Sequence, residues 1–122
     1  MVRVLIADDH LLFAEALEAI LSLDGRIQVI GRAADGPEAV DLAGSLHPDV
    51  VLMDLSMPGV DGFEATERIL ADDGHTNVLV LSGSADPADV AKARTAGAVG
   101  YITNDRIAEK LLDAILEAGR IP

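Results

Sequence analysis

The sequence predicts an α/β domain in which a parallel sheet of five strands is covered by helices on both faces. Five short apolar runs alternate along the chain with five segments that carry helical spacing or helix caps. Four of the five runs have the continuous apolar character of strands that are buried on both faces. Such alternation favours parallel strands joined by right-handed crossover connections.

The composition limits the classes of protein to which the chain can belong. With 122 residues and 50% of them apolar, it is expected to form one domain with an ordinary core. The net charge of −12 would repel the DNA backbone and anionic membranes, so we expect this domain to contact neither. The absence of cysteine excludes disulfides and thiol catalysis. No apolar run resembles a signal peptide or approaches the roughly 20 residues of a membrane span, which predicts a cytoplasmic domain.

The first third of the chain is predicted to form a strand, a helix and a second strand. The β-branched run Val2–Ala7 stops at the polar residues Asp8, Asp9 and His10. The following helix, Leu11–Leu23, is expected to end at Gly25 as its C-cap and to bury one apolar stripe. That stripe consists of Leu12, Ala16, Ala19, Ile20 and Leu23. The segment Ile27–Ala34 is a weaker strand and is expected at an edge of the sheet.

A second helix and the central strand follow. Asp35, Gly36 and Pro37 have the character of a cap, a turn and a first-turn proline, and they predict a helix over Glu38–Leu46 that ends before Pro48. The apolar run Val50–Met53 then leads directly into Asp54. Turn-forming residues come next, namely Ser56, Pro58, Gly59 and Gly62. Asp54 is therefore predicted to lie at the C-terminal end of a strand that is buried on both faces.

The second half of the chain repeats the strand and helix pattern twice after a helix over Phe63–Leu70. The first predicted strand is Val78–Leu81, which ends at Ser82, and the helix after it runs from Asp86 and Pro87 to Ala96 with Gly97 as C-cap. The second predicted strand is Ala98–Ile102, which ends at Thr103, Asn104 and Asp105, and a helix over Arg106–Glu117 follows it. The last helix carries Ile107, Leu111, Ala114, Ile115 and Ala118 on one face. We assign residues 1–119 to the domain and 120–122 to the start of a linker or tail.

Acidic side chains follow two of the predicted strands at their C-terminal ends. In open α/β sheets the crevice beyond these ends is where ligands bind. If the first and third strands are neighbours, Asp8, Asp9 and Asp54 converge there, and two carboxylates about 4 Å apart repel by roughly 4 kcal/mol. Mg²⁺ would relieve this repulsion, because it prefers oxygen ligands and often joins carboxylates to a phosphate. Asp54 could then attack phosphorus, with Ser82 and Asn104 as hydrogen-bond donors to the transferring group.

Four motifs in order resemble the receiver domain of bacterial two-component response regulators. They are VLIADDH, VVLMDLSMPGVDG, VLVLS and AGAVGYI, and the resemblance runs from Val2 to about Gly119. The segments GRAADGPEAV and AGAVGY resemble the subfamily in which a receiver is joined to a LuxR-type helix-turn-helix. The resemblance implies a flavodoxin-like sheet with strand order 2-1-3-4-5, an order that the spacing alone does not establish.

The resemblance also implies a role for individual residues. Asp54 would accept a phosphoryl group from a sensor histidine kinase. Mg²⁺ would be held by Asp8, Asp9, Asp54 and the backbone carbonyl of Ser56, with Asp9 as a direct ligand. Ser82 matches the hydroxyl residue that moves toward the phosphoryl group, and Tyr101 matches the aromatic residue that changes rotamer with it.

One position departs from the family pattern, because Asn104 stands where the family carries a lysine. A charged hydrogen bond contributes roughly 1.5–3 kcal/mol against roughly 0.5–1.5 kcal/mol for a neutral one. Loss of the ammonium could therefore slow phosphorylation or weaken its coupling to the output. The alternative function is a receiver that works without phosphorylation, as an interaction or dimerisation module.

The resemblance implies a phospho-acceptor that phosphorylates and dephosphorylates itself at most, not a turnover enzyme. Its partners would be a sensor kinase, a DNA-binding output domain in the same chain if this is an excised domain, and a possible homodimer. Two enzyme classes on the same fold fit the residues less well. An aspartate-nucleophile phosphatase would need an acid where Ser56 stands, and a flavin carrier would need a hydroxyl-rich and glycine-rich loop after the first strand. The histidines His10, His47 and His75 lie in separate loops without paired spacing, which favours surface positions over metal binding.

Overall fold

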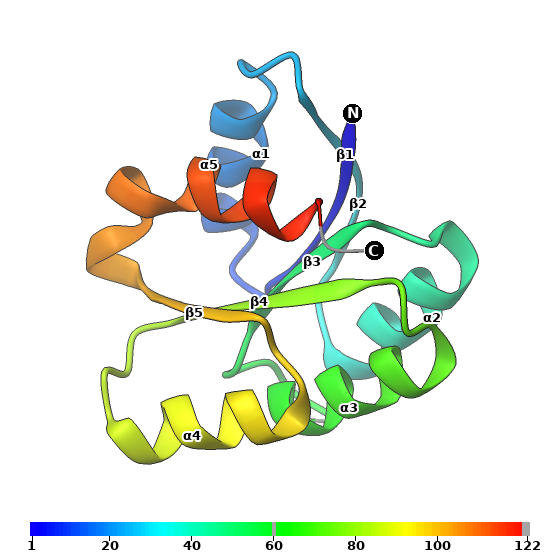
Figure 1. Cartoon of the computed structure of the whole chain (residues 1–122), viewed down its shortest axis with the longest axis vertical. Coiled ribbons are helices and arrows are strands. Elements are labelled where there is room, and N and C mark those ends of the chain that lie inside the picture. Colours follow the sequence, from blue (N-terminus) through cyan, green and yellow to red (C-terminus); the bar gives the residue numbers. More distant parts are fainter. Residues whose placement is uncertain (60, 121–122) are drawn as a thin grey trace.

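The computed structural model of the chain, which describes residues 1–59 and 61–120, contains a five-stranded parallel sheet of order β2-β1-β3-β4-β5. The strands are β1 (Val2–Ala7), β2 (Ile27–Ala33), β3 (Val50–Asp54), β4 (Asn77–Ser82) and β5 (Gly100–Thr103). The helices are α1 (Leu11–Leu21), α2 (Gly36–Leu46), α3 (Gly62–Asp72), α4 (Pro87–Ala96) and α5 (Ile107–Ala118), with a short 3-10 turn over Asn104–Arg106. The predicted fold class and strand order are confirmed, and β2 lies at an edge of the sheet (Figure 1).

Each face of the sheet has its own apolar core, because alternate residues of a strand point to opposite faces. On β1, Val4 and Ile6 belong to the core under α1 and α5, whereas Leu5 and Ala7 belong to the core under α2, α3 and α4. Figure 1 shows the same arrangement, with α1 and α5 on one side of the strands and the other helices opposite. β3 and β4 contribute to both cores, which agrees with their nearly continuous apolar sequences.

Helix α1 buries a different face from the one predicted. The buried residues are Ala14, Leu17 and Leu21, while Leu12 and Leu23 are 80% and 87% exposed. Ala16, Ala19 and Ile20 are exposed as well. The segment LLFAEALEAIL is apolar on nearly every side, so two helical stripes compete, and periodicity alone cannot decide which of them meets the sheet.

The ends of several elements also differ from the predicted ones. Helix α1 ends at Leu21 with Ser22 as its C-cap, so the prediction of Gly25 as the cap is wrong. Gly25 instead lies in a turn where the Asp24 side chain accepts a hydrogen bond from the backbone N–H of Arg26 at 2.9 Å. β5 begins at Gly100, two residues later than predicted, and Asn104–Arg106 forms the 3-10 turn before α5. Of the predicted tail over 120–122, residues 121–122 lie outside the described part of the chain.

Aspartates begin three of the helices, as the sequence predicted for two of them. The side chains of Asp35, Asp61 and Asp86 accept hydrogen bonds from backbone N–H groups in the first turns of α2, α3 and α4. This pattern satisfies N–H groups that have no partner inside the helix and places a negative charge at the positive end of its dipole. Gly97 ends α4 in the left-handed conformation with φ of 109°, as predicted.

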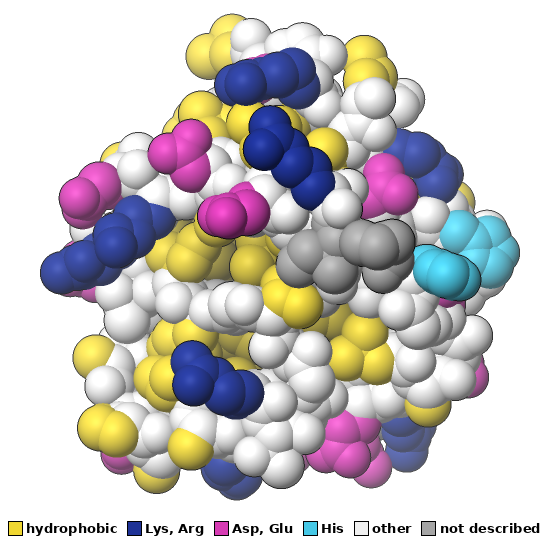
Figure 2. All heavy atoms as spheres, in the orientation of Figure 1, with side chains coloured by type: hydrophobic (Ala, Val, Ile, Leu, Met, Phe, Trp, Pro, Cys, Tyr) yellow, Lys and Arg dark blue, Asp and Glu magenta, His cyan; other side chains and the backbone are white. Residues whose placement is uncertain are grey.

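The surface carries charges of both signs. Figure 2 shows Lys and Arg side chains interspersed with Asp and Glu over the described part of one face. None of the helices in the described part of the chain has the length and apolar character needed to cross a membrane.

Candidate functional site

The strand order brings the predicted acidic residues to one edge of the sheet. β1 and β3 are parallel neighbours, and Ala7 at the end of β1 pairs with Met53 of β3. The next residue along the chain is an aspartate in both cases: Asp8 directly follows β1, and Asp54 is the last residue of β3. Both carboxylates therefore lie beyond the C-terminal ends of adjacent strands, at the point where the winding of the sheet reverses.

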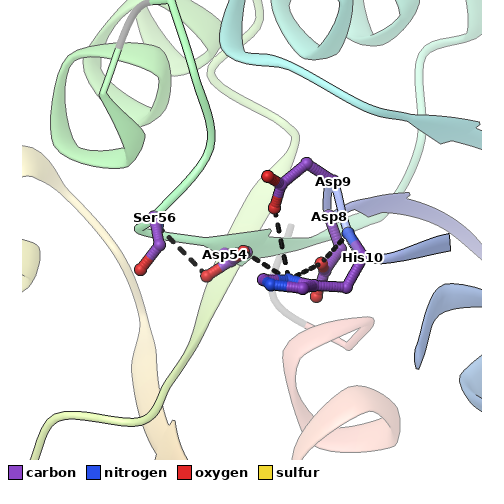
Figure 3. A network of polar contacts seen from close by, with 5 residues as sticks. All are labelled: Asp8, Asp9, His10, Asp54 and Ser56. Atoms are coloured by element: carbon purple, nitrogen blue, oxygen red, sulfur yellow. Dashed lines mark hydrogen bonds and ion pairs between the residues drawn. The ribbon is translucent and has the colours of Figure 1, made fainter. Parts of the chain in front are cut away.

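Asp8, Asp9, His10 and Asp54 form one cluster, in which each residue offers a ligand atom within 4.8 Å of the others. Figure 3 shows the side chains converging on the His10 ring. The Nδ1 atom of His10 lies 3.0 Å from Asp8 Oδ1, 3.2 Å from Asp9 Oδ1 and 3.8 Å from Asp54 Oδ2. The carboxylates of Asp8, Asp9 and Asp54 thus lie close together and are only partly exposed to solvent.

The two oxygens of Asp54 have different surroundings. Oδ1 accepts a hydrogen bond from the backbone N–H of Ser56 at 3.1 Å. Oδ2 is buried and has no hydrogen-bond partner among the described residues. Burial raises the pKa of the Asp54 carboxyl, and the charges of Asp8 and Asp9 raise it further, whereas the Ser56 hydrogen bond and His10 act in the opposite direction. A buried carboxylate oxygen without a hydrogen bond, next to two further carboxylates, fits a hard divalent cation with oxygen ligands.

Replacing Asp54 by asparagine is expected to stabilise the metal-free protein by about 0.5–2 kcal/mol, a typical gain when a strained functional group is removed. The raised pKa means that ionised Asp54 disfavours the folded state. This penalty is present at neutral pH and disappears as the pH falls through the folded-state pKa, which lies above 3.8. Melting temperatures of both proteins in EDTA at about pH 7 and about pH 4 measure the stabilisation and its loss at low pH. Each kcal/mol of stability should shift the melting temperature by roughly 3–6 °C. An unchanged or lower melting temperature for Asp54→Asn at neutral pH would contradict this account.

The cluster lies in an open pocket of about 530 Å³. Its polar lining includes Asp8, His10, Asp54, Ser56 and Asn104, and its apolar lining includes Leu12, Phe13 and Leu81. Asn104, which stands where the resembled family has a lysine, therefore faces the same pocket as Asp54. The exposed Leu12 also gives the pocket an apolar rim. The sequence prediction placed Leu12 on the buried face of α1, so this rim was not predicted.

Ser82 and Tyr101 are connected through a residue that sequence reasoning missed. Ser82 is buried at the end of β4, and its Oγ accepts a hydrogen bond from the backbone N–H of Ser84 at 3.1 Å. The carbonyl of Ser84 accepts a hydrogen bond from the Tyr101 hydroxyl at 2.8 Å. The Ser84 hydroxyl donates to Asp89 Oδ2 at 2.7 Å, which ties the loop after β4 to α4. A serine in a short polar loop carries no motif, so the sequence held no signal for this connection.

His10 is a second residue of the site that the sequence did not connect with the acidic side chains. Its side chain is 68% exposed, as expected for a loop histidine, yet its ring nitrogen lies among all three carboxylates. The hydrogen bond to Asp8 and the charges of Asp9 and Asp8 raise the pKa of the imidazole. The available signal was its position directly after the acidic pair.

Comparisons with known proteins agree with this fold. The family model for the response regulator receiver domain matches residues 4–116. The transcriptional regulatory protein LiaR of Bacillus subtilis is 42% identical over 120 residues, covering 98% of this chain and 57% of LiaR, so the chain spans little more than half of that relative. A LuxR-family two-component response regulator from Aurantimonas sp. SI85-9A1 superposes with a TM-score of 0.91 at 34% identity, covering 96% of this chain and 84% of that one. The CheX-CheY-BeF3-Mg²⁺ complex of Borrelia burgdorferi gives a TM-score of 0.88 at 28% identity, with coverages of 95% and 87%.

Proposed function

Because the chain belongs to the family of response regulator receiver domains, we propose that Asp54 accepts a phosphoryl group with the help of Mg²⁺ and thereby switches an output domain. The observation that carries the proposal is the convergence of Asp8 and Asp9 on the buried Oδ2 of Asp54, which has no hydrogen-bond partner among the described residues. The relative from Borrelia, whose complex contains BeF3 and Mg²⁺, supports the same chemistry in this fold.

The chain's own residues would hold the metal and position the nucleophile. Asp9, whose carboxylate is 32% exposed, would bind the ion directly. Asp8 is held in place because its Oδ1 accepts a hydrogen bond from the backbone N–H of His10 at 2.8 Å. The remaining ligands would be Asp54 and the carbonyl oxygen of Ser56. When bound, Mg²⁺ neutralises negative charge on the phosphoryl oxygens and so lowers the barrier to transfer.

The transfer itself is a displacement at phosphorus. A carboxylate oxygen of Asp54 forms a bond to phosphorus while the bond from phosphorus to the donor breaks, and the donor leaves with the electron pair. In the cell the donor would be the phosphorylated imidazole of a sensor histidine kinase. Asn104 lines the pocket and can donate an amide hydrogen bond to a phosphoryl oxygen. Hydrolysis of the aspartyl phosphate would return the protein to its starting state, so it would not be a turnover enzyme.

The contacts of Ser84 suggest how the signal would leave the pocket. If the Ser82 hydroxyl moves to donate to the phosphoryl group, the hydrogen bond from Ser84 N–H to Ser82 Oγ must lengthen or break. The Ser84 carbonyl would then shift relative to the Tyr101 hydroxyl that it accepts from. We propose that Tyr101 changes its rotamer in response, and that α4 and β5 carry the change to a DNA-binding output domain of the LuxR type. This domain itself, with a net charge of −12, would not contact DNA.

The proposal is tested by mass spectrometry of the intact protein after incubation with acetyl phosphate and Mg²⁺. The wild type is expected to gain one phosphoryl group, and both Asp54→Ala and wild type in EDTA are expected to gain none. A folded wild type that stays unlabelled in Mg²⁺ would contradict the proposal. That result would favour the alternative, an interaction module that keeps the pocket without using it.

Restoring the family lysine should strengthen phosphorylation. Asn104→Lys is expected to increase the labelling rate or the lifetime of the phosphorylated state about fivefold, because replacing a neutral hydrogen bond by a charged one adds about 1 kcal/mol. Time courses of labelling and of decay after removal of acetyl phosphate measure the two effects separately. Asn104→Gln is the matched neutral control. Equal rates and lifetimes for the wild type and Asn104→Lys would show that this position does not limit the reaction.

A further inference from the structure

We infer that His10 is a ligand of the divalent ion in this pocket and makes the pocket favour ions that accept nitrogen ligands, Mn²⁺ and Co²⁺, more strongly than carboxylates alone would. The inference rests on the proposed function only in placing a divalent ion beside Asp54. It assigns to this chain a metal selectivity that the three aspartates do not provide.

The first argument is the placement of the ring nitrogen. Nδ1 of His10 lies 3.0 Å and 3.2 Å from the nearest oxygens of Asp8 and Asp9 (Figure 3). In an octahedral site with metal–ligand bonds of about 2.1 Å, neighbouring ligand atoms are about 3.0 Å apart. The nitrogen and the two carboxylate oxygens therefore already have the separations of neighbouring ligands. The 3.8 Å to Asp54 Oδ2 leaves that oxygen within reach of the same ion.

The second argument is that the described structure directs His10 to this cluster alone. The described hydrogen bonds and ion pairs of its ring all go to Asp8, Asp9 and Asp54. Its backbone N–H donates to Asp8 Oδ1 at 2.8 Å, which holds the loop so that the ring faces the acids. With 68% of its side chain exposed, the ring can adjust by rotation without disturbing the core.

The third argument is the chemistry of the donor set. Mg²⁺ strongly prefers oxygen ligands and retains its waters, so an imidazole adds little to its binding. Mn²⁺ and Co²⁺ accept imidazole nitrogen together with carboxylate oxygen, and their affinity for such mixed sites increases from Mn²⁺ to Co²⁺. A nitrogen beside two aspartate oxygens should therefore raise the affinities for Mn²⁺ and Co²⁺ relative to that for Mg²⁺, while the Mg²⁺ affinity itself changes little.

The experiment uses the whole chain and needs no phosphodonor. Pulsed electron paramagnetic resonance of bound Mn²⁺ detects a directly coordinated imidazole through its ¹⁴N coupling, and calorimetric titrations give affinities for Mn²⁺, Co²⁺ and Mg²⁺. Metal binding requires an unprotonated ring nitrogen, so all measurements are made at about pH 8. The variants are His10→Ala and, as a matched control, His75→Ala, which removes an exposed histidine outside the cluster.

We expect ¹⁴N coupling in the wild type and in His75→Ala, and none in His10→Ala. We also expect His10→Ala to lower the Mn²⁺ and Co²⁺ affinities by about tenfold or more, since even indirect supports of metal ligands are often worth that much. The Mg²⁺ affinity should change by less than about threefold, the small effect expected when a nitrogen ligand is removed from an oxygen-preferring ion. Wild-type spectra without ¹⁴N coupling, or equal losses for all three ions, would overturn the inference.

The outcomes separate this inference from the proposed function. If Asp54 is labelled in Mg²⁺ but Mn²⁺ shows no coordinated nitrogen, only the role of His10 is wrong. If ¹⁴N coupling is present but Asp54 is never labelled, the pocket is a metal site and the phosphoryl-transfer proposal is wrong. If no divalent ion binds to the folded protein, both are wrong.

Discussion

Replacing Asp9 by asparagine is expected to lower the Mg²⁺ affinity, and with it the labelling of Asp54 at limiting Mg²⁺, by tenfold to about a hundredfold. Two unit charges about 4 Å apart interact by roughly 4 kcal/mol at an intermediate dielectric. The Asp9 carboxylate is 32% exposed, so solvent screening reduces this contribution. A remaining loss of about 1.4–2.8 kcal/mol corresponds to the expected change. Calorimetry or backbone amide NMR shifts can follow the titration, since the chain has no tryptophan for fluorescence.

Asp41→Asn is the control for this experiment. It removes the same charge from an exposed position on α2, outside the cluster, and so reproduces any general effect of the net charge of −12. Asp9→Asn also relieves repulsion from its neighbours, so its melting temperature in EDTA should not fall below that of the wild type. A loss of Mg²⁺ binding in both variants would assign the effect to overall charge and count against a direct role for Asp9.

Gly62→Ala is expected to destabilise the protein by about 1–3 kcal/mol, the usual cost of forcing extra atoms into a packed site. A Cβ at this first residue of α3 would lie 2.7 Å from the Cα of Leu55 and 2.9 Å from the backbone oxygen of Asp54. The backbone must therefore move just where Asp54 is positioned, so the labelling rate should fall together with the stability. Urea denaturation measures the free energy of unfolding, and acetyl phosphate labelling measures the effect on the site.

Gly44→Ala makes the same chemical change at a position where the added methyl group should stabilise the protein. Gly44 lies inside α2, and a Cβ there would have no heavy atom within 4 Å. Alanine is expected to stabilise this helix by about 0.5–1 kcal/mol. If both variants shifted the free energy of unfolding in the same direction, the close approach of α3 to the Asp54–Leu55 backbone would not be a constraint on the fold.

The sequence predicted the strands and the position of Asp54 well because the signals there are local and strong. A buried parallel strand needs a continuous apolar run, and Val50–Met53 has few other interpretations. The aspartate caps of α2 and α4 could be predicted equally well, because an acid one or two residues before a proline is typical of a helix start.

The buried face of α1 and the contacts of His10 and Ser84 could not be predicted from the sequence, because they depend on tertiary packing. Helix α1 has apolar residues on both of its faces, and only the docking of Ala14, Leu17 and Leu21 on the sheet selects one. The position of His10 depends on how the loop after β1 turns back over Asp8, and spacing in sequence does not encode that turn. Ser84 takes part in the site through its backbone N–H and carbonyl, which every residue type possesses.

The anchoring of α5 has a practical consequence for such measurements. The amide of Asn77, at the start of β4, donates to the carbonyl of Ala118 at 3.0 Å, and Gly119 packs closely against Val2 at the start of β1. The end of α5 therefore lies by the amino ends of the strands, whereas Asp54 lies at the carboxyl end of β3, about 13 Å farther along the strand at about 3.3 Å per residue. Immobilising the protein on a biosensor chip through a tag behind α5 should thus leave the acidic pocket open to metal ions and phosphodonors.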